Sequence, residues 1–274
     1  MATENASYFS NSYPGEAPHF DGNIYRLDAL ATPKYPLGFK VSRADGNVYR
    51  YGQFGAATNR GLLVAPDISE VGVVDTDNGM ISPASATTTS DGTLGSYFIQ
   101  ITMDGIIANQ FKGAYLHTTD DTGEGYTYRI KGNTASGTPT GTDYRLELYS
   151  PLQVAIDNTT DYTITPSLYN DLEAATAATD NIVVGVSVAT STAAKPYAFV
   201  QTRGPATVLN DETVPIIGEL LMLSEVTAGA VAPFLTDSVG TVAALEIRAA
   251  QLVGYCIAAG DSTGHTSVFL TLPE

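Results

Sequence analysis

The sequence predicts an all-β protein made of β-sandwich or β-barrel units. Residues 182–273 break into short apolar runs separated by Gly, Pro, Asn, Asp, Ser and Thr, which is the pattern of strands and turns. The runs are IVVGVSVA, YAFVQTRG, TVPIIGELLML, GAVAPFL, LVGYCIAA and SVFLTLP. Thr, Val and Tyr favour strands, and few segments place apolar residues at helical spacing. We therefore expect far more strand than helix.

Residues 1–36 indicate an extended N-terminal arm. Proline, Ser, Asn and Gly interrupt any regular period there, yet the segment holds five aromatic residues. They are Tyr8, Phe9, Tyr13, Phe20 and Tyr25. Aromatic side chains in an extended segment dock on a surface, either the body of the same protein or a neighbouring subunit. In the second case these five residues form an intersubunit or partner interface.

The clearest hairpin follows at residues 38–51. Two β-prone runs flank Asp45-Gly46, and this pair favours the positive φ values of a type I′ turn. A second pair, Asp104-Gly105, separates residues 97–103 from 106–111. The alternating residues on the first arm of that hairpin are Tyr97, Ile99, Ile101 and Met103. Their period of two predicts a half-buried strand.

Further strands are expected along the rest of the chain. Their approximate positions are 125–131, 144–149, 182–189, 197–203 and 268–272. Two segments hint at a short helix. Ser167–Ala178 has apolar residues at helical spacing after a possible cap, and Gly240–Val253 is ambiguous between helix and strand.

A change of composition suggests how the chain is divided. Residues 75–95 are rich in turn-forming residues, which makes them the best candidate boundary. A faint internal repeat links the segment that begins at Tyr49 with the one that begins at Phe199. We therefore expect residues 37–80 and 181–274 to form one β-domain, with residues 81–180 inserted as a second.

The chain is strongly acidic, with 13 Lys and Arg against 29 Asp and Glu, a net charge of −16. This charge disfavours nucleic acid and anionic membranes as partners. Residues 26–60 differ, because six basic and two acidic residues give them a net charge of +4. The basic residues pair within the fold, or they face an acidic partner surface, for which Arg43, Arg50 and Arg60 are the candidates.

Residues that could carry catalysis do not form a known motif. The sequence lacks the nucleophile elbow, the zinc-protease motif, the phosphate-binding loop and the Cys-x-x-Cys pair, so we expect neither an enzyme nor a cofactor. None of the histidines has the partner of a helical metal site; they are His19, His117 and His265. Residues 120–124 form an acidic loop, which is a solvated turn or a Ca²⁺ site without the EF-hand spacing.

The single cysteine and the start of the chain suggest a protein made in a reducing compartment. Cys256 lies within an apolar run, where a buried thiol is expected. The first residues lack the basic and apolar regions of a secretory signal, and no apolar run is long enough to span a bilayer.

Three blocks of the sequence carry a resemblance. They are GAYLHTTDDTGEGYTYRI at 113–130, VGVSVA at 184–189 with YAFVQTRGPA at 197–206 and VFLTL at 268–272, and YPLG at 35–38 with DGNVYRY at 45–51. Together these blocks resemble virion structural proteins of tailed bacteriophages, of the type that decorates or cements the head. The resemblance rests on strand and turn patterns and transfers no functional residue.

The resemblance implies an all-β, non-catalytic protein that binds the lattice of the major capsid protein in many copies. It also implies a homo-oligomer, often a trimer, on the capsid surface of the virion after synthesis in the host cytoplasm. The alternative is a tail or fibre component that recognises host-surface glycans, for which aromatic loops would serve.

Overall fold

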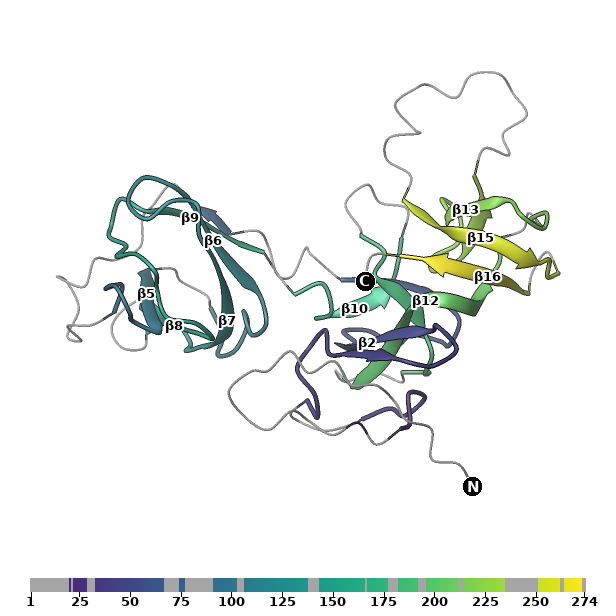
Figure 1. Cartoon of the computed structure of the whole chain (residues 1–274), viewed down its shortest axis with the longest axis horizontal. Coiled ribbons are helices and arrows are strands. Elements are labelled where there is room, and N and C mark those ends of the chain that lie inside the picture. Colours follow the sequence, from purple (N-terminus) through teal and green to yellow (C-terminus); the bar gives the residue numbers. More distant parts are fainter. Residues whose placement is uncertain are drawn as a thin grey trace, which may run out of the picture. The chain divides into compact units, whose positions relative to one another are not determined.

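The computed structural model of the 274-residue chain shows only strands, turns and loops where it describes the backbone. The described residues are 20, 22–28, 33–66, 74–76, 91–102, 106–137, 143–165, 167–176, 182–191, 196–211, 214–234, 251–261 and 264–272. The all-β prediction is therefore confirmed (Figure 1). Across these residues, no helix has the length and apolar character that a membrane crossing requires.

The contacts divide the chain into two compact units. Unit 1 consists of residues 1–67 and 168–274, and unit 2 consists of residues 68–167. We expected the inserted unit at residues 81–180. Its first and last residues each lie 13 positions earlier, at 68 and 167. The described part of the N-terminal arm belongs to unit 1.

Unit 2 contains one six-stranded antiparallel sheet that curls into a half-barrel (Figure 1). In spatial order its strands are β4 (Val74–Thr76), β9 (Asp161–Thr165), β6 (Tyr115–Asp120), β7 (Thr127–Asn133), β8 (Asp143–Leu148) and β5 (Phe98–Thr102). Alternate side chains of the strands fill one core. Its fully buried members include Ile99, Leu116, Ile130, Leu146 and Ile164. On the opposite face of β5, β8 and β7, Phe98, Arg145, Glu147 and Lys131 are partly or fully exposed, whereas Gln100 is buried.

Of the hairpin expected at 97–111, the first strand is present and the second is not. Ile99 and Ile101 are fully buried as predicted, whereas Tyr97 precedes the strand and is 48% exposed. Residues 106–111 were expected to be a strand and instead form turns, which corrects that prediction. Asn133 holds these turns, because its backbone carbonyl accepts from Asn109 N and its side chain accepts from Phe111 N. Met103, Asp104 and Gly105 lie outside the described residues.

Unit 1 contains a ten-stranded antiparallel sheet. Its main path is β10 (Leu172–Ala174), β3 (Leu63–Pro66), β11 (Gly185–Ser187), β12 (Tyr197–Leu209), β16 (His265–Thr271), β15 (Leu252–Ala258), β13 (Leu220–Leu223) and β14 (Val231–Pro233). The hairpin of β1 (Lys40–Ser42) and β2 (Val48–Gln53) joins this path through β12.

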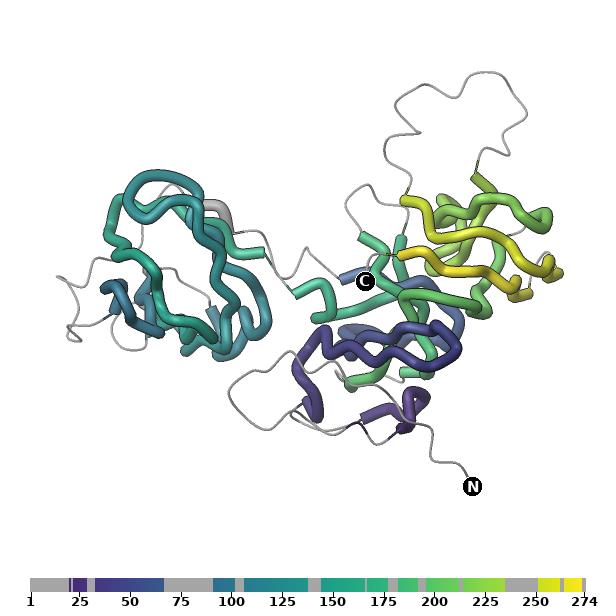
Figure 2. The backbone as a smooth tube through the Cα atoms, in the orientation of Figure 1, coloured from purple at the N-terminus to yellow at the C-terminus, as the bar shows by residue number. Residues whose placement is uncertain are grey.

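Strand β12 connects the two parts of this sheet. Its first residues pair with β2 and β11, and its residues from Arg203 to Leu209 pair with β16 (Figure 2). The change of partner coincides with a bulge and with Gly204, whose φ is +91°. The two segments of the faint internal repeat therefore lie on neighbouring strands, with Tyr51 opposite Phe199.

The hairpin at 38–51 forms with a different turn from the one predicted. A type I′ turn needs positive φ at both Asp45 and Gly46, and only Gly46 has it, at +85°. Gly46 N donates to Arg43 O, and Arg43 N donates to Asn47 O, so a type I turn is followed by a glycine bulge. Asp45 stabilises the turn by accepting hydrogen bonds from the backbone and side chain of Asn47.

The expected helix at Ser167–Ala178 is wrong for its described residues. Turns and the short strand β10 replace it, because the backbone of residues 172–174 pairs with β3. Asp171 has a φ of +56°, which a right-handed helix does not allow. In the ambiguous segment Gly240–Val253, the last two residues belong to β15 and residues 240–250 lie outside the described part.

Candidate interaction surface

Four neighbouring strands of unit 1 carry almost no charge. Strands β12, β16, β15 and β13 contain one Lys, Arg, Asp or Glu residue among them, Arg203. Over the whole chain, 15% of the residues are charged. One face of these strands packs into the core of unit 1 through fully buried residues. They include Val208, Leu221, Val253, Val268 and Leu270.

The solvent face of the same strands carries an apolar row among polar residues such as Thr207, Ser267 and Thr271. Pro205 on β12 is the register partner of Phe269 on β16, and Phe269 is the partner of Tyr255 on β15. Tyr255 is in turn the partner of Leu220 on β13. The rings of Tyr255 and Phe269 stack with centroids 5.2 Å apart and planes 13° apart. A continuous apolar row thus crosses four strands.

Exposed isoleucines extend this row at the β15 and β13 end. Ile216 and Ile217 are 73% and 69% exposed, and they lie in the turn that leads into β13. Backbone hydrogen bonds of Gly218 and Glu219 with Cys256 hold this turn against β15. We call the apolar row, together with the exposed apolar residues beside it, the apolar face. It consists of Pro205, Ile216, Ile217, Leu220, Leu252, Tyr255, Ile257 and Phe269.

An antiparallel sheet with one solvated face normally alternates apolar and polar residues. Along the row from Pro205 to Leu220, the sheet of unit 1 is apolar on both sides, as is typical of a sheet covered on both sides. Exposed apolar patches of this kind mark contacts with other proteins. The apolar face is therefore the strongest candidate interaction surface of unit 1. The sequence showed the apolar runs but not which of them align.

The aromatic residues proposed for the arm have different environments. Phe20 is buried and contacts Tyr35 and Phe199 in a core cluster of unit 1. It therefore docks on the body of its own chain, which is one of the two alternatives. Tyr25 is 57% exposed. Tyr8, Phe9 and Tyr13 lie outside the described residues.

Of the three arginines proposed for an interface, Arg43 and Arg50 lie in the hairpin of β1 and β2, and Arg60 lies in the turn before β3. Arg50 donates a 2.7 Å hydrogen bond to Gly38 O and lies over the ring of Tyr169 at 5.9 Å. Burial raises the pKa of Tyr49, and a hydrogen bond with Arg43 works against that rise. Arg60 is exposed. Arg50 and Arg43 thus have partners within the fold.

The histidine and acidic loop of unit 2 have structural roles. Nδ1 of His117 lies 3.0 Å from Oγ1 of Thr127, and Nε2 lies 2.8 Å from Oγ1 of Thr165. Both ring nitrogens are therefore engaged in hydrogen bonds. In the following loop, Glu124 N donates to Asp121 O, which closes a turn. Among the described residues, no three His, Cys, Asp or Glu side chains gather as a metal site would need.

Cys256 has the environment that the sequence predicts. Its side chain is 1% exposed and lies in the core cluster beneath the apolar face. His265 is exposed at the start of β16, and His19 lies outside the described part.

Comparison of the chain with protein-family models, with curated proteins and with solved structures finds no match.

Proposed function

We propose that the protein is a non-catalytic virion component of a tailed bacteriophage that decorates or cements the head by binding the major capsid protein lattice. It would act as a homo-oligomer, a trimer, on the capsid surface after synthesis in the host cytoplasm. The observation that supports this proposal best is the apolar face of unit 1.

A surface with one charged residue on its four strands, Arg203, is suited to contact with another protein. Burying it removes apolar area from water, worth about 25 cal/mol per Å². Leu220, Tyr255 and Phe269 carry no charge, so burying them does not incur the free-energy cost of removing an ion from water. The net charge of −16 meanwhile keeps separate copies of the protein soluble.

Binding to heads tests the proposal. The purified protein is mixed with undecorated heads of the phage that encodes it, and co-sedimentation is measured against protein concentration. We expect saturable binding, weakened at least about tenfold by Leu220→Asp, which places a charge in the apolar row. Ile107→Asp is the matched control, because Ile107 is 66% exposed on unit 2. Heads that bind no wild-type protein would rule out the proposal.

The N-terminal arm is tested separately. Deleting residues 2–19 removes Tyr8, Phe9 and Tyr13 but keeps the buried Phe20. We expect this deletion to weaken trimer formation or head binding, with the oligomeric state measured by analytical ultracentrifugation. A deletion that leaves both unchanged would assign the interface to the apolar face alone.

A further inference from the structure

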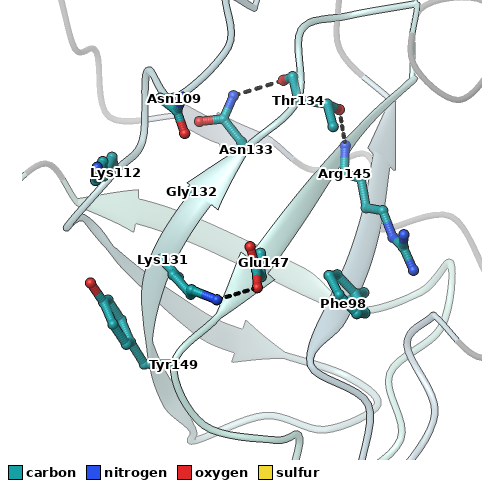
Figure 3. A pocket seen from close by; sticks show the side chains of 10 residues that line it. All are labelled: Phe98, Asn109, Lys112, Lys131, Gly132, Asn133, Thr134, Arg145, Glu147 and Tyr149. Carbon is teal, nitrogen blue, oxygen red and sulfur yellow. Dashed lines mark hydrogen bonds and ion pairs between the residues drawn. The ribbon is translucent and has the colours of Figure 1, made fainter. Parts of the chain in front are cut away.

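An open groove of about 420 Å³ lies on the solvent face of β5, β8 and β7 in unit 2 (Figure 3). This volume falls in the range of small-molecule sites. Ten residues line it: Phe98, Asn109, Lys112, Lys131, Gly132, Asn133, Thr134, Arg145, Glu147 and Tyr149. Neither a catalytic role nor the proposed capsid contact uses these residues.

The groove exists because a glycine occupies the middle of its floor. Glu147 is the register partner of both Gly132 and Phe98, so these three positions form a row across the strands. A Cβ atom at position 132 would lie 2.7 Å from Oδ1 of Asn109. Glycine thus lets the Asn109 side chain reach over the strand. A bulge between Ile130 and Gly132 makes Lys131 the extra residue of β7.

The rim of the groove is held in place by a buried asparagine. The side chain of Asn133 accepts from Phe111 N at 2.8 Å and donates to Ile107 O at 2.9 Å. These bonds fix the turn that carries Asn109 and Lys112. Asn109 has a φ of +62°, a conformation that asparagine tolerates better than most residues. The polar groups of the rim are therefore ordered before any ligand arrives.

The groove carries positive charge in an acidic protein. Three basic residues and one acidic residue line it. Lys131 Nζ lies 2.6 Å from Glu147 Oε1, and Arg145 pairs at 2.8 Å with Asp91, which is buried. Lys112 is exposed, and its side chain makes no hydrogen bond or ion pair with any residue that the structure describes. Lys112 is thus the cation free to meet an anionic ligand.

Aromatic rings stand at both ends of the groove. Phe98 and Arg145 lie on one side of the Lys131–Glu147 pair and Tyr149 on the other (Figure 3). The Arg145 guanidinium lies 3.8 Å from the centroid of the Phe98 ring. Cation–π contacts of this kind orient the ring. The groove therefore offers apolar ring surface beside amide, ammonium and carboxylate groups.

We propose that this groove binds a saccharide that carries an acidic group, with the carboxylate on Lys112 and a sugar ring against Tyr149. Sugars combine hydroxyl groups with apolar ring faces, and the lining offers partners for both. A long polyphosphate would be repelled by the net charge of −16. Among the described strands, β7 and β8 are paired on both sides, so an added peptide strand would find a free edge only at β5. This inference does not depend on the proposed capsid contact.

Isothermal titration of the full-length protein tests the site with a matched pair of ligands. One is a trisaccharide that ends in glucuronic acid, and the other is the same trisaccharide ending in glucose. We expect saturable binding of the acidic trisaccharide and at least tenfold weaker binding of the neutral one. Lys112→Gln should weaken binding of the acidic ligand about tenfold. Lys40→Gln, an exposed lysine of unit 1, should leave it unchanged.

A gain of affinity provides the sharpest readout. Glu147→Gln removes the acidic group and releases Lys131, so the acidic trisaccharide should bind several-fold more tightly. Circular dichroism checks that each variant is folded. Equal affinity for the two trisaccharides, absence of binding, or tighter binding of a tetraglutamate peptide would each overturn the proposal, the last by assigning the groove to a protein partner.

Discussion

The hydroxyl of Tyr51 donates a 3.0 Å hydrogen bond to Oδ2 of Asp28, and both side chains are buried. The same hydroxyl accepts from Lys34 N at 3.4 Å. The backbone of Asp28 also exchanges two hydrogen bonds with Tyr197 on β12. Arg26 Nε lies 2.9 Å from Oδ1 of Asp28, as an ion pair without hydrogen-bond geometry. One tyrosine thus ties two points of the N-terminal segment to the sheet.

Replacing Tyr51 with phenylalanine should lower the free energy of unfolding by about 1.5–3 kcal/mol, because a hydrogen bond to a buried charge is lost. Urea denaturation measures the change. Tyr25→Phe is the control, since Tyr25 is 57% exposed. If the two variants were equally stable, the bond to Asp28 would contribute nothing.

Stability should fall as the pH rises above about 10. Burial raises the pKa of Tyr51 and of Tyr144 well above the usual value of tyrosine. A raised pKa stabilises the fold fully below the unfolded pKa, and this contribution is lost as the pH rises from the unfolded toward the folded value. Absorbance at alkaline pH should show these tyrosines ionising only when the chain unfolds. Their ionisation in the folded protein would contradict the buried environment.

Gly46→Ala should destabilise the protein by about 1–2 kcal/mol. The cause is backbone strain alone, because Gly46 has a φ of +85° and a Cβ atom there would meet nothing within 4 Å. Gly46→Asn should cost less, since asparagine tolerates positive φ. Thermal unfolding of both variants measures the difference. Equal melting temperatures for alanine and wild type would mean that the turn relaxes.

Unit 2 should fold by itself. Residues 68–167 contain a complete six-stranded sheet with its own core, and both neighbours of each inner strand lie within the unit. The isolated segment should show a cooperative urea transition and a near-ultraviolet signal from buried Tyr144 and Tyr162. A gradual transition without that signal would show that unit 2 needs unit 1 to fold.

The fold class and the buried strand faces could be predicted because period-two patterns are local. Ile99 and Ile101 alternate within five residues, so burial of that face follows from the sequence. The helix at Ser167–Ala178 failed because pairing with β3, about 100 residues earlier, decides the backbone there. The hairpin turn failed in detail because Asp-Gly fits both turn types, and only the register separates them.

The two surfaces could not be predicted because each depends on register between distant strands. Leu220, Tyr255 and Phe269 form a row only once three strands align. The groove likewise needs Gly132 opposite Glu147. The arm residue Phe20 is a related case. The aromatic residues of the arm predicted that it docks on a surface, but they did not predict that Phe20 would pack against Phe199.

The long strand β12 also affects how the chain folds during synthesis. Tyr51 on β2 is paired with Phe199, which the ribosome adds 148 residues later. At typical rates of 5–20 residues per second, this interval is about 7–30 s. All of unit 2 is synthesised within this interval. During the same time, β2 and its aromatic neighbours have no β12 strand to pair with. The inserted unit is therefore expected to fold first, and closure of unit 1 around β12 sets the period during which the nascent chain is most exposed to aggregation.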